Sequence, residues 1–331
     1  MNSKLTFGLF ALILLGCGGR NDKPAEEVQE LGKGIVVPVF NSDSAYGFVK
    51  YQVELGPRVP TSEAHKKAGD FFVKTLKSFG AKIHEQHFDA STFDGKRVSL
   101  RNIIASFQPE KQKRILLMAH WDTRPFADKD INQPDQPFDG ANDGASGVGV
   151  LLEIARMVGQ SPPQNVGVDI ILFDGEDWGE KENSSSGYSL PSHLQSWWCL
   201  GSQYWSKNPH VVNYSAYFGI LLDMVGAKNA HFFKEGVSVE YANQTVNRVW
   251  AIASRLGYSG TFINQKVGAT MDDHVFVNEV AKIPSISIVD YQPGVGFFGD
   301  YHHTQNDNLD LISRETLGIV GNTVLHVIYY E

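Results

Sequence analysis

The sequence of 331 residues lacks any basic run long enough to follow a nucleic-acid backbone, and it shows no internal repeat. Its formal net charge of −8 is spread along the chain, so nucleic-acid binding is not expected. The composition shows no extreme either, with 42% hydrophobic, 11% aromatic and 20% charged residues. These values exclude a disordered or fibrous protein and allow one large α/β domain or two ordinary ones.

A long apolar segment is also absent from the N-terminus. The run from Leu5 to Leu15 is too short to span a bilayer comfortably, but it follows Lys4 and has the size of a signal-peptide core. The stretch Leu14-Leu15-Gly16-Cys17 resembles a bacterial lipobox, in which the cysteine is lipidated after cleavage. An ordinary signal peptide that happens to contain Cys17 is the alternative.

We therefore expect residues 1–17 to be a lipoprotein signal peptide, residues 18–34 a polar tether, and residues 35–331 a single catalytic domain. The lipid on Cys17 would anchor the protein, as a monomer, to a membrane of the bacterial cell envelope, facing the periplasm. Cys199 is the second of only two cysteines, so lipidation of Cys17 leaves no disulfide within the chain. We expect Cys199 to be a small buried residue.

Apolar runs that alternate with helical patterns predict an α/β fold with a twisted, mostly parallel sheet and helices on both faces. The run 114–120 is apolar almost throughout, as expected for a strand that is covered on both faces. The predicted strands are 98–107, 114–120, 168–173, 219–224 and 283–289, and the predicted helices are 60–79, 145–158, 241–256 and 313–330. The segment 179–198 is rich in Ser and Gly, which predicts an inserted loop near whatever functional site the sheet forms.

Acidic residues and histidines follow the predicted strands directly. Sites in open α/β sheets gather at the carboxyl ends of strands, so we expect these side chains to lie together. Alone, each has a simpler explanation: Asp143 as a helix N-cap, Asp223 as a turn cap, and His120 as a structural histidine. Their joint placement favours a metal site, and carboxylates and imidazoles without cysteine are typical of catalytic zinc. The segments are 120–122, 139–147, 174–177, 221–223, 272–274 and 302–303.

Glu176 and Asp177 form an adjacent acidic pair, and Asp174 lies just before them, so three carboxylates fall within four residues. Carboxylates this close repel one another, so a bound cation is expected to offset the repulsion. Such a site needs one carboxylate on the metal and a neighbour that is free to carry a proton. At a strand end the chain turns, so adjacent side chains can approach one centre from different directions.

As a set, these motifs resemble those of the two-zinc aminopeptidase family M28, from near Ala45 onward. The glutaminyl cyclases of animal type, a branch of that family with bacterial relatives, are more similar still. The family resemblance rests on His120-x-Asp122, Asn142–Gly147, Glu176-Asp177, Leu222–Met224 and His303, and the cyclase resemblance adds Leu221–Ala227, Asp272-Asp273-His274 and His303-Thr304-x-x-Asp307-Asn308.

The resemblance to the aminopeptidases implies two zinc ions that share Asp143. One would be bound by His120, Asp143 and Asp223, and the other by Asp143, Asp177 and His303. The resemblance to the cyclases implies one zinc ion per chain, at Asp143, Asp177 and His303. All of these positions are filled here, so the ligands leave both possibilities open.

Asp272 separates the two possibilities. The aminopeptidases usually have one acid before the histidine of this motif, whereas the cyclases have two, as here. In the cyclases the extra acid lies near the counterpart of Asp223, and two carboxyls in contact tend to share a proton. An Asp223 engaged in this way is a poor ligand for a second zinc ion and can instead steer the proton on Glu176. The alternative for Asp272 is a helix N-cap.

The resemblance therefore implies a zinc-dependent cyclase that converts the N-terminal Gln of peptides and proteins to pyroglutamate and releases ammonia. A two-zinc aminopeptidase is the alternative. Zinc would polarise the amide carbonyl, and Glu176 would carry the proton from the attacking amine to the ammonia. Trp178, Trp197 and Trp198 are candidate walls of a dry pocket, or else ordinary core residues.

Three positions depart from the animal-type cyclase pattern. Asp177 replaces the usual Glu, which would bring the metal closer to the backbone. Met271 stands where a polar residue is usual, and His302 stands where Trp usually precedes the last histidine. His302 is thus a candidate substrate-binding residue and an alternative metal ligand, although the residues after His303 match the cyclase motif and favour His303.

Overall fold

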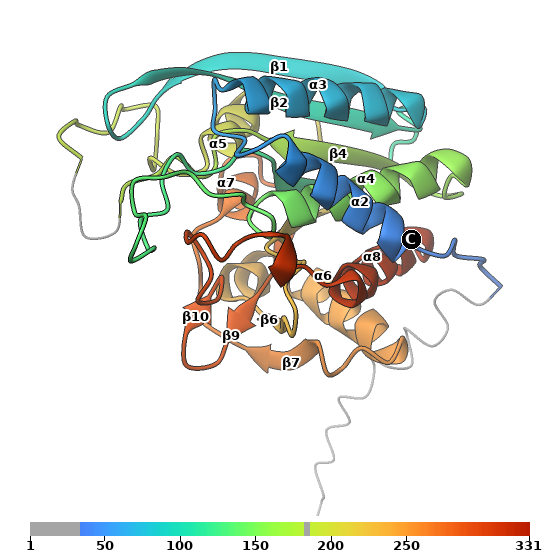
Figure 1. The fold of residues 1–331 in the computed structure, drawn as a ribbon. Coiled ribbons are helices and arrows are strands. Elements are labelled where there is room, and N and C mark those ends of the chain that lie inside the picture. Colours follow the sequence, from blue (N-terminus) through green and yellow to red (C-terminus); the bar gives the residue numbers. More distant parts are fainter. Residues whose placement is uncertain (1–33, 182–185) are drawn as a thin grey trace, which may run out of the picture.

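Six strands form the central sheet of the computed structural model, which describes residues 34–181 and 186–331 (Figure 1). In spatial order they are β1 (Lys82–Ser91), β2 (Arg97–Phe107), β4 (Gly167–Phe173), β3 (Arg114–His120), β5 (Phe218–Asp223) and β8 (Ser285–Val289). The last four are parallel, whereas β2 is antiparallel to both of its neighbours. The predicted mixed α/β sheet is therefore confirmed.

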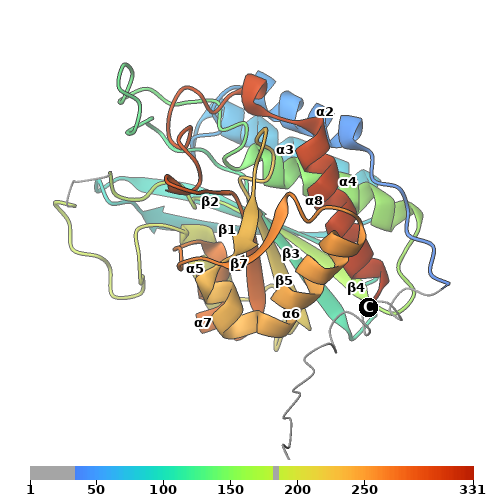
Figure 2. The same ribbon diagram turned by 90° about the horizontal axis from the view of Figure 1, so that it is seen from below.

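Helices cover both faces of the sheet, as predicted (Figures 1 and 2). One face carries α3 (Glu63–Ser78), α4 (Ala145–Gln160), α6 (Gly236–Arg255) and α8 (Arg314–Tyr329), with α2 (Ser42–Glu54) packed on α4. The other face carries the shorter α5 (Leu200–Lys207) and α7 (Asp273–Glu279). Strand side chains alternate between the two cores: Leu117 packs on the α4 side, and Leu116 and Met118 pack on the α5 side.

Every predicted strand and helix is present; the strand 114–120 has the predicted ends, and the other elements have shifted ends. The helix predicted from Pro60 begins at Glu63, because Ser62 caps it by accepting from the His65 amide. The helix predicted from Tyr241 begins earlier, at Gly236, and is kinked at Ala242. Short elements complete the chain: β6 (Phe232–Lys234), β7 (Phe262–Lys266), β9 (Tyr291–Gln292), β10 (Gly296–Phe297) and a 3₁₀ turn η1 (Leu309–Leu311).

The predicted signal peptide, Cys17 and nearly all of the predicted tether lie outside the described residues. Within the described part of the chain, no helix has the length and apolar character needed to cross a membrane. The described part of the predicted loop 179–198 contains neither helix nor strand, and α5 begins just after it.

The start of α4 lies so close to the end of β5 that only glycine fits at position 147. A Cβ on Gly147 would meet the carbonyl oxygen of Leu222 at 2.2 Å. This close approach brings Asp143, just before α4, to the strand end that carries Asp223.

We expect Gly147→Ala to lower the free energy of unfolding by about 1–3 kcal/mol, because α4 must move away from β5. Gly47→Ala in α2 is the matched control, since a Cβ there meets nothing within 4 Å. The control should be neutral or should stabilise the protein by up to about 1 kcal/mol. Urea unfolding measures both values, and equal stabilities would contradict the close contact.

Candidate active site

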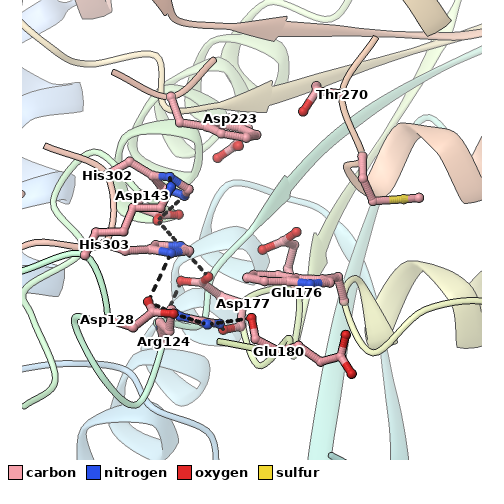
Figure 3. A pocket seen from close by; sticks show the side chains of 14 residues that line it. Arg124, Asp128, Asp143, Glu176, Asp177, Glu180, Asp223, Thr270, His302 and His303 are labelled. Carbon is pink, nitrogen blue, oxygen red and sulfur yellow. Dashed lines mark hydrogen bonds and ion pairs between the residues drawn. The ribbon is translucent and has the colours of Figure 1, made fainter. Parts of the chain in front are cut away.

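Polar side chains from the carboxyl ends of the parallel strands surround a cavity of about 330 Å³ (Figure 3). The expectation that strand-end residues lie together therefore agrees with their placement. Of the residues predicted for the site, those that line this cavity are Asp143, Glu176, Asp177, Trp198, Asp223, His302 and His303.

Two potential metal ligands, Asp143 and Asp177, each approach His303. His303 Nε2 lies 2.9 Å from Asp177 Oδ1 and 3.5 Å from Asp143 Oδ2. The three side chains are between 1% and 4% exposed, and within the described ranges Asp143 Oδ2 has no hydrogen-bond partner. A buried polar atom without a partner is costly, so a cation beside it would be stabilising. Two carboxylates and one imidazole suit zinc and leave a fourth position for a substrate.

Asp143 is available to this site because it does not cap the helix that follows it. The N-cap position of α4 is Gly144, whose φ of 82° favours glycine, and no side chain among the described residues caps the first turn. Asp307 Oδ2 instead accepts a hydrogen bond from the backbone amide of Asp143 at 3.0 Å. The carboxylate of Asp143 therefore points toward His302 and His303 (Figure 3).

Both His302 and His303 approach Asp143, so distance alone does not decide which of them binds a metal. Lys129 Nζ lies 2.8 Å from His302 Nδ1, and an ammonium can only donate, so His302 carries its proton on Nε2. His303 is arranged in the opposite way: Nδ1 faces Asp128 Oδ1 at 3.5 Å, and Nε2 faces the carboxylates. These partners favour His303 as the ligand and His302 as a hydrogen-bond donor.

Glu176 and Asp177 are adjacent but have different partners. Their backbone amides both donate to the carboxylate of Asp122, at 3.1 and 3.2 Å, which holds the turn after β4. Asp177 faces His303, whereas Glu176 Oε1 lies 3.1 Å from Cys199 Sγ. The pair thus offers one carboxylate to a metal and leaves the other to carry a proton.

Burial raises the pKa of Glu176 well above its usual range, and the carboxylates of Asp177, Asp273 and Asp272 raise it further. The positive charge of His120 lowers this pKa without outweighing the other effects. A cation held by Asp177 would lower it again, toward the range of a general base that works near neutral pH. Glu176 is therefore suited to exchange a proton with a bound molecule.

A second group of potential ligand atoms shares Asp143. His120 Nε2 lies 3.0 Å from Asp143 Oδ1 and 3.2 Å from Asp223 Oδ1, and all three side chains are buried. Burial lowers the pKa of His120, but Asp122, Asp143 and Asp223 outweigh it and raise the pKa well above its usual value. A protonated His120 satisfies these carboxylates without a metal, whereas a zinc ion would displace that proton. Whether this group holds a proton or a zinc ion therefore depends on whether Asp223 is free to bind the metal.

Asp272 caps α7 and also acts on Asp223. Its Oδ1 accepts from the amide of Asp273 at 2.6 Å, and its Oδ2 accepts from Ser287 Oγ at 3.1 Å. Burial raises the pKa of Asp272 well above its usual range, and among the neighbouring charges Asp223 raises it most. Burial raises the pKa of Asp223 too. Two neighbouring acids with raised pKa values hold a proton between them more readily than two isolated acids.

The three tryptophans of the segment after β4 have different surroundings. Trp198 lines the cavity and stacks on His303, with ring centres 5.9 Å apart and an interplanar angle of 4°. Trp178 and Trp197 do not line it and pack instead in a buried apolar cluster with Leu100 of β2. This placement corrects the expectation that all three wall the pocket, because the chain turns two of the rings toward the apolar side chains of β2.

Asp174 and His274 belong to neighbouring polar networks. Asp174 is buried and accepts from His65 Nε2 at 2.9 Å and from the Arg101 amide at 2.6 Å, so it fixes the end of β4. His274 Nε2 lies 3.1 Å from Glu235, the N-cap residue of α6, and His274 does not line the cavity. Of the segment 272–274, the acids therefore act on the site and the histidine supports the fold.

Several buried residues that hold the site were not predicted from the sequence. Arg58 donates to two backbone carbonyls of the glycine-rich turn before α4, at 2.5 and 2.7 Å. Arg124 and Asp128 lie beside the metal-binding atoms and line the cavity. Their position shortly after the motif His120-x-Asp122 was the only signal in the sequence.

Comparisons with known proteins agree with this geometry. The Zn-dependent exopeptidase structure from Parabacteroides distasonis is 52% identical, with a TM-score of 0.85, and the match covers 89% of this chain and 99% of that chain. The glutaminyl cyclase of Bacteroides thetaiotaomicron, solved with N-acetylhistamine bound, is 49% identical, with a TM-score of 0.84 and coverage of 89% and 100%.

Among curated proteins, aminopeptidase YwaD of Bacillus subtilis is 28% identical over 239 residues. This match covers 69% of the present chain but only 44% of that protein, so the chain spans less than half of its length. The family model described as Peptidase family M28 matches residues 102–328, well over half of the chain. The chain therefore belongs to Peptidase family M28.

Proposed function

We propose that this protein is a glutaminyl-peptide cyclotransferase, which converts an N-terminal Gln to pyroglutamate and releases ammonia. The observation that carries the proposal is the buried carboxyl of Asp272, whose pKa is raised by burial and, among the neighbouring charges, most by Asp223. Two acids coupled in this way would compete with a second metal ion for Asp223. Glutaminyl cyclases of Bacteroides thetaiotaomicron and Tannerella forsythia, 49% and 48% identical to this chain, support it. Peptides and proteins with an N-terminal Gln are the proposed substrates.

The reaction joins the α-amine of the substrate to the carbonyl carbon of its Gln side chain and breaks the bond to the amide nitrogen, which leaves as ammonia. Zinc, one ion per chain, would be held by Asp143, Asp177 and His303 and would polarise that carbonyl. Glu176 accepts a proton from the attacking amine and returns it to the leaving nitrogen, so protons balance. Asp223 and Asp272 steer the proton on Glu176.

We assign substrate binding to Trp198 and His302, which both line the cavity. Trp198 offers an apolar ring that excludes water from a reaction in which no water attacks. His302 offers its Nε2–H as a donor to a substrate carbonyl, because Lys129 occupies its other nitrogen. Met271, which is 50% exposed and lines the same cavity, places an apolar side chain at the mouth.

Cys199 touches the proposed proton carrier, so its replacement should affect turnover. We expect Cys199→Ala to lower turnover with a Gln-leading peptide about 2- to 10-fold, because Glu176 loses one weak hydrogen bond. Cys199→Ser keeps a donor and should lose less. Steady-state kinetics with a zinc assay checks both variants, and wild-type turnover in Cys199→Ala would show that the thiol contact is unimportant.

The role of Asp272 is tested by counting bound zinc. Asp272→Ser keeps a residue suited to the N-cap of α7 but removes the carboxyl. We expect this variant, and likewise Asp272→Asn, to bind a second zinc ion through the freed Asp223 at saturating zinc, whereas the wild type binds one. Two zinc ions in the wild type would contradict the proposal.

A two-zinc aminopeptidase is the competing function, because His120, Asp143 and Asp223 place one ligand atom each within 4.8 Å of one another. The exopeptidase structure of Parabacteroides distasonis and the curated aminopeptidase are relatives whose names agree with it. A zinc count of two with release of the first residue from peptides would decide for this function.

We also propose that Cys17 carries a lipid that anchors the domain to a membrane of the bacterial cell envelope, facing the periplasm. The support comes from the sequence alone: the short apolar run after Lys4 and the lipobox-like residues before Cys17. A monomer is proposed as well. Mass spectrometry of the membrane fraction tests the lipid, and an unmodified, soluble mature chain would contradict it.

A further inference from the structure

Arg124 is a fully buried arginine beside the metal-binding atoms, and each of its side-chain N–H groups has a partner (Figure 3). Nε and Nη2 donate to the two carboxylate oxygens of Asp128, each at 2.8 Å. Nη1 donates to the carbonyls of Asp177 and Gly179 at 3.0 and 3.1 Å, and Nη2 also donates to the carbonyl of Glu180 at 3.0 Å. These bonds use all five donors of a guanidinium.

The same residue contacts one potential metal ligand directly and reaches a second through Asp128. The backbone amide of Arg124 donates to Asp177 Oδ2 at 2.9 Å, and Asp177 Oδ1 faces His303 Nε2 at 2.9 Å. Asp128, which the guanidinium holds, lies 3.5 Å from His303 Nδ1. The contacts close a ring of four residues. This ring decides which oxygen of Asp177 and which nitrogen of His303 face the cavity.

Aromatic rings fix the plane of the guanidinium. Its central carbon lies 4.4 Å from the ring centre of Phe126 and 4.6 Å from that of Trp198. Lysine is a poor substitute in such a place, because its ammonium has three donors at one point and no plane to stack. The surroundings of residue 124 therefore require the planar guanidinium of arginine, and a positive charge alone does not suffice.

We propose that Arg124 is a positioning residue of the zinc site, which it controls directly through Asp177 and, through Asp128, at His303. The inference rests on the proposed function and adds to its zinc site a residue that orients the metal ligands. Arg124 supplies no bond to the zinc or the substrate in this account. It holds two ligands from different segments, one after β4 and one before α8, in a single geometry.

Zinc affinity tests this role without any measurement of activity. The probe is the zinc ion itself, in competition with a colorimetric chelator. We expect Arg124→Lys to weaken zinc binding about 10- to 100-fold, which is the usual effect of groups that orient metal ligands. Asp128→Asn removes the carboxylate that faces His303 and should weaken binding over the same range.

Arg114 provides a matched control. It too is almost buried and makes a two-pronged contact with one carboxylate, Asp169, and bonds with three backbone carbonyls. It lies at the opposite end of β3 from the cavity. Arg114→Lys should therefore lower the stability measured by urea unfolding but leave zinc affinity within about twofold of the wild type, since it touches no ligand.

The visible spectrum of the cobalt-substituted protein gives a second readout, because it responds to the orientation of the ligands. We expect a changed spectrum for Arg124→Lys and Asp128→Asn, and an unchanged one for Arg114→Lys. If Arg124→Lys does not fold, the zinc affinity and spectrum of Asp128→Asn test the inference instead. Wild-type zinc affinity and spectrum in the folded variants, or equal weakening in Arg114→Lys, would overturn the inference. A wild type that binds no zinc would instead overturn the proposed function.

Discussion

Glu176→Gln is expected to abolish most turnover while the protein keeps its zinc. Gln has nearly the shape of Glu but cannot accept the proton of the attacking amine, so we expect turnover to fall about 10²- to 10⁴-fold. Zinc should stay bound because Asp177, not Glu176, faces His303. Steady-state release of ammonia from a Gln-leading peptide and a zinc assay on the same sample measure both effects.

Glu180→Gln is the matched control for this variant. Glu180 also lines the cavity, but its carboxylate accepts from the amide of Ser186 and is not placed in the reaction. We expect the control to retain turnover within a few fold of the wild type. Near-normal turnover in Glu176→Gln would refute the assignment of Glu176, and loss of zinc from it would mean that Glu176 is a ligand.

His303→Asn is expected to lose zinc, whereas His302→Asn keeps it. Asn suits this test because His303 has a φ of 57°, a conformation that Asn tolerates better than most residues. We expect zinc affinity to fall more than about 100-fold, because loss of a ligand exceeds the 10- to 100-fold cost of losing a group that orients one. Turnover should fall with the zinc content.

The two neighbouring histidines control for each other. His302→Asn removes the Nε2–H donor to the substrate, because the shorter Asn side chain does not reach that position, so we expect a higher KM with zinc affinity close to that of the wild type. Chelator competition on both variants separates the roles. If His302→Asn lost zinc and His303→Asn kept it, the ligand assignment that rests on the contacts of Lys129 and Asp128 would be reversed.

The parts of the fold that sequence predicted are those with a strong apolar pattern. The strand 114–120 is buried at every residue, and its pattern was unambiguous. β1 was missed because most of its residues are exposed or half-buried and polar, as in Lys82, Glu85 and Gln86. Its pairing with β2 comes from the tertiary fold rather than from its own sequence. α2 was missed for a similar reason. Only three of its residues, Ala45, Val49 and Gln52, are buried, so its apolar pattern is weak.

The candidate site divides in the same way. Glu176, Asp177 and Asp223 were predicted because each ends a strand or closely follows one, and topology alone brings strand ends together. Asp272 lies at a helix start, and its relation to Asp223 was implied by family resemblance, with the helix cap as an alternative. The structure shows the helix cap, and the contribution of Asp223 to the raised pKa of Asp272 is consistent with the other role. Arg124 was missed because its partners are mainly backbone carbonyls of a distant loop, which no residue pattern encodes.

The choice between cyclase and peptidase is tested most directly by two peptides that differ only in their first residue, Gln or Leu. The purified protein is incubated with each, and ammonia, free amino acids and peptide masses are followed. The account predicts equal amounts of ammonia and pyroglutamyl peptide from the Gln peptide, with every peptide bond intact, and no change in the Leu peptide. Release of free leucine, or of glutamine without ammonia, would contradict it and establish an aminopeptidase.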